Sequence, residues 1–592
     1  MSEEPKNIWK KSWTGLHWLK AWAILAGATF VIIYVIGVMT ARPQGGSEWC
    51  GLGLFALIAG IVVATLFLLL WMFIRWLCCW KNFRRFLFVG ACLATLIALA
   101  YAEEDWRGWY DLQKFKHHWE AKGEKFDWQS LVPPAVPDDE NFAMAPIWVE
   151  SMKAILGPTN SLQWFGSYAD DGRTKFVNRL DMPVQREGDD SPTNGIGDWQ
   201  RATLGNLKAW QDYYRTLAAT TNLFPVAPQP QTPAQDVLLA LSKYDSTIEE
   251  LRTAGERPYS RFPLYYNRED VWGILLPHLA VLKACSLVLR LRTTAELQNG
   301  QTDKALDDVK LSLRLIDSIQ TEPSLISHLV RIAMLQIALQ PIYEGLAEHQ
   351  WSDAQLAELD SQLAKLDFLA DYQLAMRGER GCDIGAVEFL RHRNRLHLNE
   401  ITGDNLNGPL NFIPLLIYYS VPSGWFCQNE LRICRFYETQ YLPVVDETNG
   451  TVSPSAVRAA EFALRRELRR RTPENFLEPL LLPDLTAAVK KFAYAQESVD
   501  LARVAIALER YRLAMGMYPE SLDALSPRFM DEIPHDIIGG EPLHYERTND
   551  GQFVLYSVGW NGRDDGGVVV YRKGGKVVDT DQGDWVWRYP AK

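Results

Sequence analysis

The 592-residue chain combines a formal net charge of −11 with 47% hydrophobic residues and a mean hydropathy of −0.15. This composition excludes collagen, low-complexity disorder and a small disulfide-stapled protein, and the length allows about three to five domains. The averages hide two unlike parts, because residues 1–102 carry nine Lys and Arg against three Glu (+6), whereas the remaining 490 residues carry −17. An acidic body repels nucleic-acid phosphates, so no nucleic-acid partner is expected.

Three uncharged apolar runs stand in this first part, at 21–41, 51–74 and 86–102. A helix needs about 20 apolar residues to cross a bilayer, so two runs are long enough and the third is at the short limit. A cleaved signal peptide fits poorly, because the first run is too long for one and a second run follows closely. We therefore predict a three-span membrane anchor over 1–102, with the lipid bilayer as partner.

The flanking Lys and Arg residues set the expected orientation of this anchor. Four lysines precede the first run and three basic residues lie at 81–85, whereas the loop between the first two runs has only Arg42 against Glu48. The positive-inside rule then places the N-terminus in the cytoplasm and everything after Ala102 in the periplasm, for a bacterial inner membrane. If the run 86–102 lies flat instead, the large C-terminal part is cytoplasmic.

Residues 103–140 are predicted as a juxtamembrane helix and a proline-rich linker. Over 103–126 apolar and aromatic residues recur at helical spacing, which predicts a helix continuing from the third run along the membrane surface. His117 and His118 are adjacent, so on a helix they point about 100° apart and do not chelate a metal together. The prolines of 131–139 end this segment.

The segment 141–490 is predicted to be a mainly α-helical exoplasmic domain. Helical periodicity dominates 271–369, and one helix is expected to end at Asn299-Gly300. Ser352 and Gln355 have the spacing of a helix-capping box.

The most polar stretch of this domain, 376–400, raises an enzymatic alternative. A cysteine with nearby histidines is the composition of a nucleophile and its base. No orienting third group or oxyanion donor is recognisable from the spacing, so we favour a solvated, salt-bridged helix and assign no catalytic or cofactor-binding residue. The cluster consists of Arg377, Glu379, Arg380, Cys382, Asp383, Glu388, Arg391, His392, Arg393, Arg395 and His397.

Four cysteines and a basic helix leave further alternatives open. Cys427 and Cys434 are seven residues apart, so on one helix their Cα atoms lie about 10.5 Å apart, too far for a disulfide. With Cys285 and Cys382 they either pair elsewhere, pair through a loop, or are buried thiols. The arginine stripe of 458–471 is either a docking face for anionic lipid or an acidic partner, or a solvated helix face.

The last segment, 491–592, predicts a helix followed by a small antiparallel sheet. An amphipathic helix over 498–514 closes at Gly516, and turn residues separate the strand-like runs that follow. The whole chain is thus expected to be an α+β membrane protein: three N-terminal transmembrane helices, a mainly α-helical exoplasmic body and this C-terminal module. The strand-like runs are 543–547, 553–558, 568–572 and 576–578.

Four phrases of this module occur in a fixed order: Tyr-x-x-x-x-Gly-x-Tyr-Pro, Leu-x-x-Leu, Pro-x-Asp…Gly-x-Pro-x-x-Tyr and Tyr-Ser-x-Gly-x-Asn-Gly. In these phrases the module resembles the globular domain of type II secretion pseudopilin G proteins. The matching residues are Tyr511, Gly516, Tyr518, Pro519, Leu522, Leu525, Pro534, Asp536, Gly540, Pro542, Tyr545, Tyr556, Ser557, Gly559, Asn561 and Gly562.

Two departures limit what this resemblance implies. The family's Asp-Pro-Trp-Gly is replaced by the stretch 536–539, which reads Asp-Ile-Ile-Gly, and the family's single stem helix with its cleaved leader is replaced by three apolar runs. The resemblance therefore implies a fold and not polymerisation into a pilus. Several family members bind calcium in the loop after the Ser-x-Gly strand, and the alternative is a set of exposed hairpin tips. The matching oxygens belong to Ser557, Asn561, Asp564, Asp565 and Asp584.

The phrases at 133–143 and 556–567 also resemble those of membrane proteins from planctomycete and verrucomicrobial bacteria, which fits an envelope setting. From these parts we expect a membrane-anchored envelope scaffold or adaptor, acting in secretion or surface assembly with envelope proteins as partners and without catalysis. The alternative is a periplasmic ligand-binding or enzymatic body whose substrate the sequence does not identify.

Overall fold

The computed structural model describes residues 15–41, 45–149, 195–220, 223–267, 271–392, 419–469, 472–575 and 577–590. They form two compact units that divide between Glu103 and Glu104. The protein is mostly helical with small antiparallel sheets, which confirms the predicted predominance of helix.

Apolar helices make up the first unit. α1 (Gly15–Ala41) and α2 (Gly46–Leu77) pack closely because Gly60 has no side chain: a Cβ there would lie 3.0 Å from the carbonyl oxygen of Ala26. The Thr29 hydroxyl donates to the Gly60 carbonyl at 3.2 Å. Many apolar side chains of this unit are exposed, and both helices are long and apolar enough to cross a membrane.

α3 (Trp80–Glu120) begins in the first unit and continues without a break into the second. It is the third helix whose length and hydropathy suffice to cross a membrane, and α11 (Leu325–Ala347) of the second unit is the fourth, with most of its length buried. The helix predicted over 103–126 is thus the second half of α3, and it ends just before Gly123, whose φ of 96° is left-handed.

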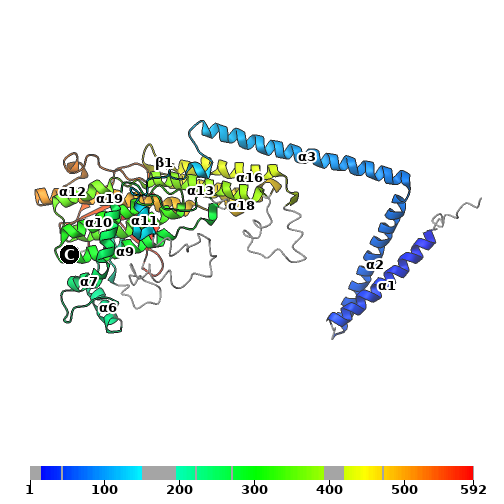
Figure 1. Ribbon diagram of the computed structural model, residues 1–592, viewed down its shortest axis with the longest axis horizontal. Coiled ribbons are helices and arrows are strands. Elements are labelled where there is room, and N and C mark those ends of the chain that lie inside the picture. The colour runs from blue at the N-terminus through cyan, green and yellow to red at the C-terminus, as the bar shows by residue number, and fades with distance from the viewer. Residues whose placement is uncertain are drawn as a thin grey trace, which may run out of the picture. The chain divides into compact units, whose positions relative to one another are not determined.

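The helices of the second unit after α3 are α6 (Leu207–Thr220), α7 (Pro233–Leu241), α8 (Asp245–Gly255), α9 (Pro277–Gln298), α10 (Thr302–Asp317), α11, α12 (Asp353–Leu363), α13 (Phe368–Arg391), α16 (Ser423–Phe436), α17 (Pro454–Arg469), α18 (Glu478–Leu481) and α19 (Thr486–Met515). α11 contacts α9, α10, α13 and α19, so it is the central helix of the unit. Figure 1 shows these helices lying side by side.

Local signals fix several helix ends where the sequence predicts them. α9 ends at Gln298, and Gly300 follows with a left-handed φ of 71°, which reverses the chain into α10. Ser352 and Gln355 form the predicted capping box of α12, in which each side chain accepts from the other residue's backbone N–H. α19 likewise ends at Gly516, with a φ of 83°.

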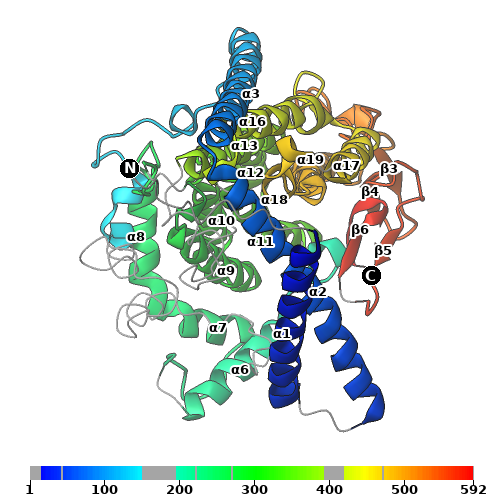
Figure 2. The same ribbon diagram turned by 90° about the vertical axis from the view of Figure 1, so that its right-hand side faces the viewer.

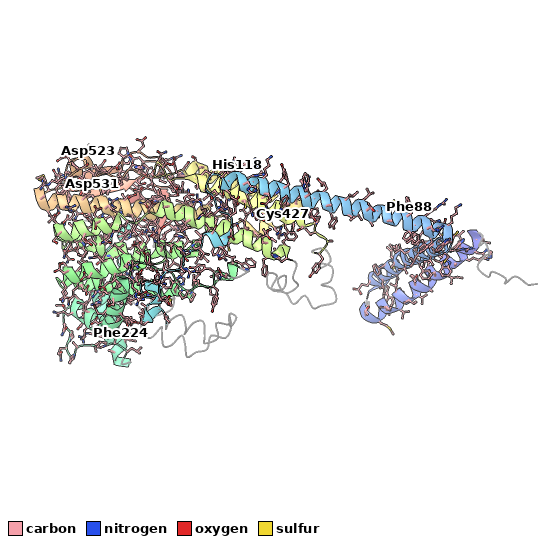
Figure 3. All side chains as sticks on the ribbon, turned by 45° about the horizontal axis from the view of Figure 1, so that its top comes forward. Phe88, His118, Phe224, Cys427, Asp523 and Asp531 are labelled. Carbon is pink, nitrogen blue, oxygen red and sulfur yellow. The ribbon has the colours of Figure 1, made fainter. Side chains whose placement is uncertain are left out.

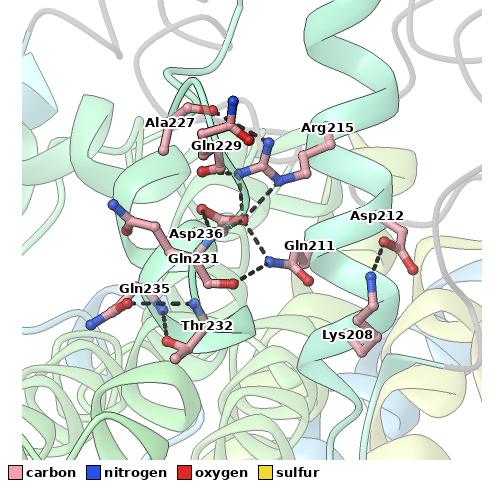
Figure 4. A network of polar contacts seen from close by, with 10 residues as sticks. All are labelled: Lys208, Gln211, Asp212, Arg215, Ala227, Gln229, Gln231, Thr232, Gln235 and Asp236. Carbon is pink, nitrogen blue, oxygen red and sulfur yellow. Dashed lines mark hydrogen bonds and ion pairs between the residues drawn. The ribbon is translucent and has the colours of Figure 1, made fainter.

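A short hairpin of helices illustrates how buried polar side chains hold loops in place (Figure 4). Asp236 of α7 is almost fully buried, and its carboxylate accepts from Gln211 at 2.6 Å and from the Arg215 Nε at 2.8 Å, both on α6. By contrast, Lys208 and Asp212 form an exposed pair along α6 alone. The contacts of Asp236 therefore hold α7 against α6, whereas the pair of Lys208 and Asp212 connects two residues of the same helix.

The strands of the described segments lie in the C-terminal part and form three small antiparallel sheets. β1 (Val445–Asp446) pairs with β2 (Thr451–Val452), and β5 (Val569–Tyr571) pairs with β6 (Val578–Gly583). The third sheet has the order β3-β4-β7, with Leu555 opposite Trp587. Figure 2 shows the strands gathered beside α17 and α19. The ranges of this sheet are β3 (His544–Arg547), β4 (Phe553–Ser557) and β7 (Trp585–Arg588).

One hydrophobic core runs through the second unit, from Phe142 to Tyr589. The final strand packs on the central helix: the ring centroids of Tyr343 and Trp587 lie 5.5 Å apart, and the Tyr343 hydroxyl donates to the carbonyl of Arg588 at 2.9 Å. The C-terminal sheet is therefore built onto the helical core and shares its apolar interior.

Candidate functional site

α13 carries the described part of the predicted polar cluster, and one face of this helix forms ion pairs. Arg377 Nη2 lies 2.8 Å from Glu124 Oε1, and Arg380 Nη2 lies 3.0 Å from Glu124 Oε2. Arg380 also pairs with Glu438, in the π-helical segment Tyr437–Tyr441 that follows α16. The sequence predicted a solvated helix here, but Arg380 and Glu438 are buried. The salt bridges are present, and neighbouring elements cover them.

Glu124 is the acid that joins these arginines to the segment following α3. Burial alone would raise the pKa of its carboxyl, but hydrogen bonds and charge from Arg377 and then Arg380 hold that pKa below its ordinary value. The ionised form is therefore the one that the fold stabilises. Replacing one partner would leave a charge without compensation, which is costly in a buried setting.

The second half of α3, residues 104–120 and called the stem from here on, packs against α16 through two glycines. A Cβ on Gly108 would lie 2.2 Å from the Gly424 carbonyl oxygen, and a Cβ on Gly424 would lie 2.0 Å from the Glu104 carbonyl oxygen. Asp105 accepts the backbone N–H of Gly424 at 2.6 Å. No other residue type fits at either position without movement of backbone.

A buried ion pair fixes the stem further along. Lys116 Nζ lies 2.5 Å from Glu430 Oε1, and the Glu430 side chain has no exposed surface. Burial raises the pKa of Glu430 to about 7, against the opposing effect of Lys116. Leu112 packs beside this pair on Cys427 and Leu431 of α16. Figure 3 marks the neighbourhood with His118 on the stem and Cys427 on α16.

The aromatic side chains predicted along the stem fall into a packed group and a solvent-exposed group. Phe115 and Trp119 pack against apolar clusters of the second unit. Trp106, Trp109 and Tyr110, nearer the apolar half of α3, are exposed.

The other face of α13 lines a pocket of about 190 Å³. Glu379 and Cys382 come from α13, and most of the remaining wall is apolar or aromatic. This wall includes Trp128, Tyr266 and Trp272, and we call the site the aromatic pocket. Its other lining residues are Leu264, Val271, Ile274, Leu276, Glu322, Pro323, Ser324, Ile326 and Gly378.

Cys382 lacks the environment of a nucleophile. Burial raises the pKa of its thiol far above the ordinary value, and the charges of Glu379 and Asp383 add to the rise. A thiolate is the reactive form of cysteine, so this thiol is not activated. His392, a histidine of the predicted cluster, is exposed at the end of α13. Arg393, Arg395 and His397 lie outside the described residues.

The oxygens of the predicted calcium site fall into separate hydrogen-bonded groups. Asp584 is buried, and its carboxylate accepts backbone N–H groups of the loop 565–568 at 2.7 to 3.2 Å. Asn561 donates to Asp565 at 2.7 Å, in the same loop. Ser557 instead donates to Asp536 at 2.9 Å.

Asp564, the fifth of these residues, faces the sheet. Its carboxylate accepts the Tyr556 hydroxyl at 3.1 Å and lies 3.6 Å from His544 Nδ1. Calcium takes about six to eight oxygens. Asn561, Asp564 and Asp565 lie in the loop between β4 and β5, whereas Asp584 lies between β6 and β7 and binds the backbone of that loop. Among the described residues no group of three or more His, Cys, Asp and Glu side chains has the arrangement of a metal site.

The structure shows the state of the cysteines whose pairing the sequence left open. All eight cysteines lie in described segments and none forms a disulfide; Cys427 and Cys434 are buried on α16.

On α17, Arg465 pairs with Glu461, and the exposed Phe462 lies among the arginines of the stripe. Arg470 lies outside the described residues.

Sequence reasoning missed the residues that hold the stem and those that line the aromatic pocket. Lys116 and Glu430 are more than 300 residues apart, and no periodicity links them. The pairing of Gly108 with Gly424 also has no local signal, although a glycine inside a helix is unfavourable by about 1 kcal/mol and so marks a position worth explaining.

Comparisons with protein family models, with curated proteins and with solved structures find no match to the chain.

Proposed function

We propose that this protein is a membrane-anchored scaffold or adaptor of the bacterial envelope. In this proposal three N-terminal helices cross the inner membrane, the N-terminus is cytoplasmic and the second unit works in the periplasm. The main support for this proposal is the stem. α3 is one helix from its apolar half to Glu120, and its second half packs on α16. A scaffold presents its partners with a fixed binding surface, and the packing of the stem on α16 makes the stem part of the second unit.

Two features favour the stated orientation. The basic residues flanking the apolar runs obey the positive-inside rule when the N-terminus is cytoplasmic. Trp106, Trp109 and Tyr110 are exposed just beyond the apolar half of α3, and Trp and Tyr are the residues that gather at a membrane–water interface. Both observations agree with a third span that ends near Ala102.

The C-terminal module supplies the proposed link to secretion or surface assembly. Its long helix α19 closes at Gly516 and is followed by Tyr518-Pro519 and an antiparallel sheet, which is the order of elements in the pseudopilin G domain that the sequence resembles. Partners would be other envelope proteins. Calcium bound by Asn561 and Asp565 of the loop between β4 and β5, together with Asp584, is part of this proposal.

Membrane topology provides the first test. In a chain whose four anchor cysteines are replaced by serine, Ser361→Cys on α12 should react with a membrane-impermeant maleimide in intact spheroplasts, because Ser361 is exposed. Arg84→Cys, in the basic stretch before the third span, is the matched control and should react only after permeabilisation. The reverse pattern would place the second unit in the cytoplasm and refute the proposal.

Native mass provides the second test. Light scattering after gentle detergent extraction from native membranes should give a protein mass well above the 67.4 kDa of one chain, with other envelope proteins in fixed ratio. A single chain without partners would contradict a scaffold function.

A further inference from the structure

The aromatic pocket combines three aromatic side chains with one carboxyl group. Trp128 and Tyr266 are buried, whereas Trp272 is 41% exposed at the rim. Trp272 is held edge-on to Phe389 of α13, with ring centroids 4.9 Å apart. An aromatic ring carries negative charge density on its face, so rings around a cavity favour a cation inside it.

Glu379 supplies a negative group to this pocket, and no ion pair joins it to a cation within the described segments. Its carboxylate accepts the backbone N–H of Leu325 at the start of α11, and burial raises its pKa. The two arginines nearest to it in sequence, Arg377 and Arg380, pair with Glu124. A buried carboxylate without a counter-charge is unfavourable, and a bound cation would remove that penalty.

Among the residues that the structure describes, the other charged groups around the pocket do not neutralise Glu379. Glu322 also lines the wall, but its Oε1 lies 2.8 Å from His278 Nε2. Arg261 lies over the Tyr266 ring at 5.1 Å from the centroid, lines a neighbouring cavity, and donates to the carbonyl of Pro133. Within the described part of the chain, the uncompensated charge of the pocket is therefore negative.

We propose that the aromatic pocket binds a small organic cation of the alkylammonium class, such as a quaternary ammonium group. The rings of Trp128, Tyr266 and Trp272 contact its methyl groups, and Glu379 is its counter-ion. The volume of about 190 Å³ matches a group of this size, since a cavity of about 150 Å³ accommodates benzene. This inference does not depend on the scaffold function; it assigns the second unit a ligand-binding site as well.

Calorimetric titration of the full chain in dodecyl maltoside tests the charge requirement. Choline should bind at least tenfold more tightly than its neutral isostere 3,3-dimethylbutan-1-ol, because the two differ chiefly in charge. Glu379→Gln should weaken choline binding by about tenfold or more and leave the isostere unaffected, a change expected from loss of a desolvated cation contact. Glu532→Gln removes an exposed carboxylate that does not line this pocket and should bind choline like the wild type.

Trp272→Ala is the second variant, and its exposed rim position makes misfolding a minor concern. It should also weaken choline binding. Dihexanoyl phosphatidylcholine distinguishes the source of the cation: binding of choline itself identifies a free ligand, and binding of the lipid alone identifies a headgroup. Equal affinities for choline and the isostere, unchanged binding in Glu379→Gln, or no binding of choline or the lipid to the wild type would overturn the proposal.

Discussion

The Tyr518 hydroxyl donates a hydrogen bond of 3.0 Å to Oε2 of Glu509, nine residues earlier in the chain. This contact ties the turn after α19 back onto the helix. His349 and Arg512 bind the same carboxylate at 3.0 and 2.7 Å, so Glu509 joins the end of α19 to His349, two residues beyond α11. Glu509 has no exposed surface, which makes it the buried acid on which this corner of the second unit depends.

Replacing this acid with Glu509→Gln should lower the free energy of unfolding at pH 7 by about 3 kcal/mol. Burial opposes ionisation, but hydrogen bonds from Arg512 and His349 hold the pKa of Glu509 at about 2. Because the pKa of Glu509 is lower in the folded than in the unfolded state, its ionisation stabilises the folded state above about pH 5. This contribution is lost as pH falls towards 2. Urea unfolding at pH 7 and pH 3 should therefore show the difference between wild type and variant shrinking in acid. Glu461→Gln, at an exposed pair on α17, should change little at either pH.

Gly108→Ala should destabilise the attachment of the stem to α16. Elsewhere in a helix this change is favourable by about 1 kcal/mol, but here the new Cβ would lie 2.2 Å from the Gly424 carbonyl oxygen. Gly90→Ala is the matched control on the same helix, because nothing lies within 4 Å of its Cβ position. Limited proteolysis in detergent should cut the Gly108 variant faster near the stem and leave the Gly90 variant resistant. Equal resistance would contradict the packing described.

Asp236→Ala should reduce stability by about 2–4 kcal/mol, because the change removes the charged acceptor that the buried Gln211 and the partly buried Arg215 share. Asp212→Ala, in the exposed pair shown beside it in Figure 4, should cost less than about 0.5 kcal/mol. Thermal unfolding followed by circular dichroism measures both. A similar loss for the two variants would mean that burial does not decide the value of these contacts.

Calcium should raise the melting temperature of the chain, and a chelator should lower it again. The expected stabilisation is about 2.7 kcal/mol at a hundredfold excess over the dissociation constant. Asp565→Asn should abolish the shift, since Asp565 accepts a hydrogen bond from Asn561 and donates its backbone N–H to Asp584. Asp523→Asn, at an exposed position before the sheet, should retain it. No shift in the wild type would leave these residues as ordinary turn formers.

Without ligand, Glu379→Gln should stabilise the protein at neutral pH. Burial raises the pKa of Glu379, so the folded state binds this proton more tightly than the unfolded state, and stability falls as pH rises above about 4.3. Glutamine cannot ionise and retains an acceptor for Leu325. The free energy of unfolding of the variant should exceed that of the wild type by an amount that grows from pH 4 to pH 8. Curves that stay parallel would show that Glu379 is already compensated.

Elements with local causes were predictable from the sequence. The apolar runs of α1 and α2 need only length and lack of charge, and the turn at Gly300 and the cap at Ser352 need only a few neighbouring residues. The strand β7 was missed because Trp585–Arg588 follows an acidic turn and is too short to show alternation.

Features made by distant contacts were not predictable. Trp128, Tyr266 and Glu379 meet only after the chain has folded, and nothing at any of the three positions indicates the other two. Hydropathy alone also does not distinguish α11 from a membrane span. The buried His328, Arg331 and Glu344 mark it as a core helix, because their partners come from neighbouring segments.

The contact between Tyr343 and Arg588 also sets the timing of folding during synthesis. The two residues are 245 positions apart, and a ribosome adds about 5–20 residues per second, so roughly 10–50 s separate their appearance. For that interval the surface of α11 that β7 later covers has no partner. The nascent chain must therefore be shielded from aggregation until its last residues emerge, and a chain that stops before β7 never buries that surface.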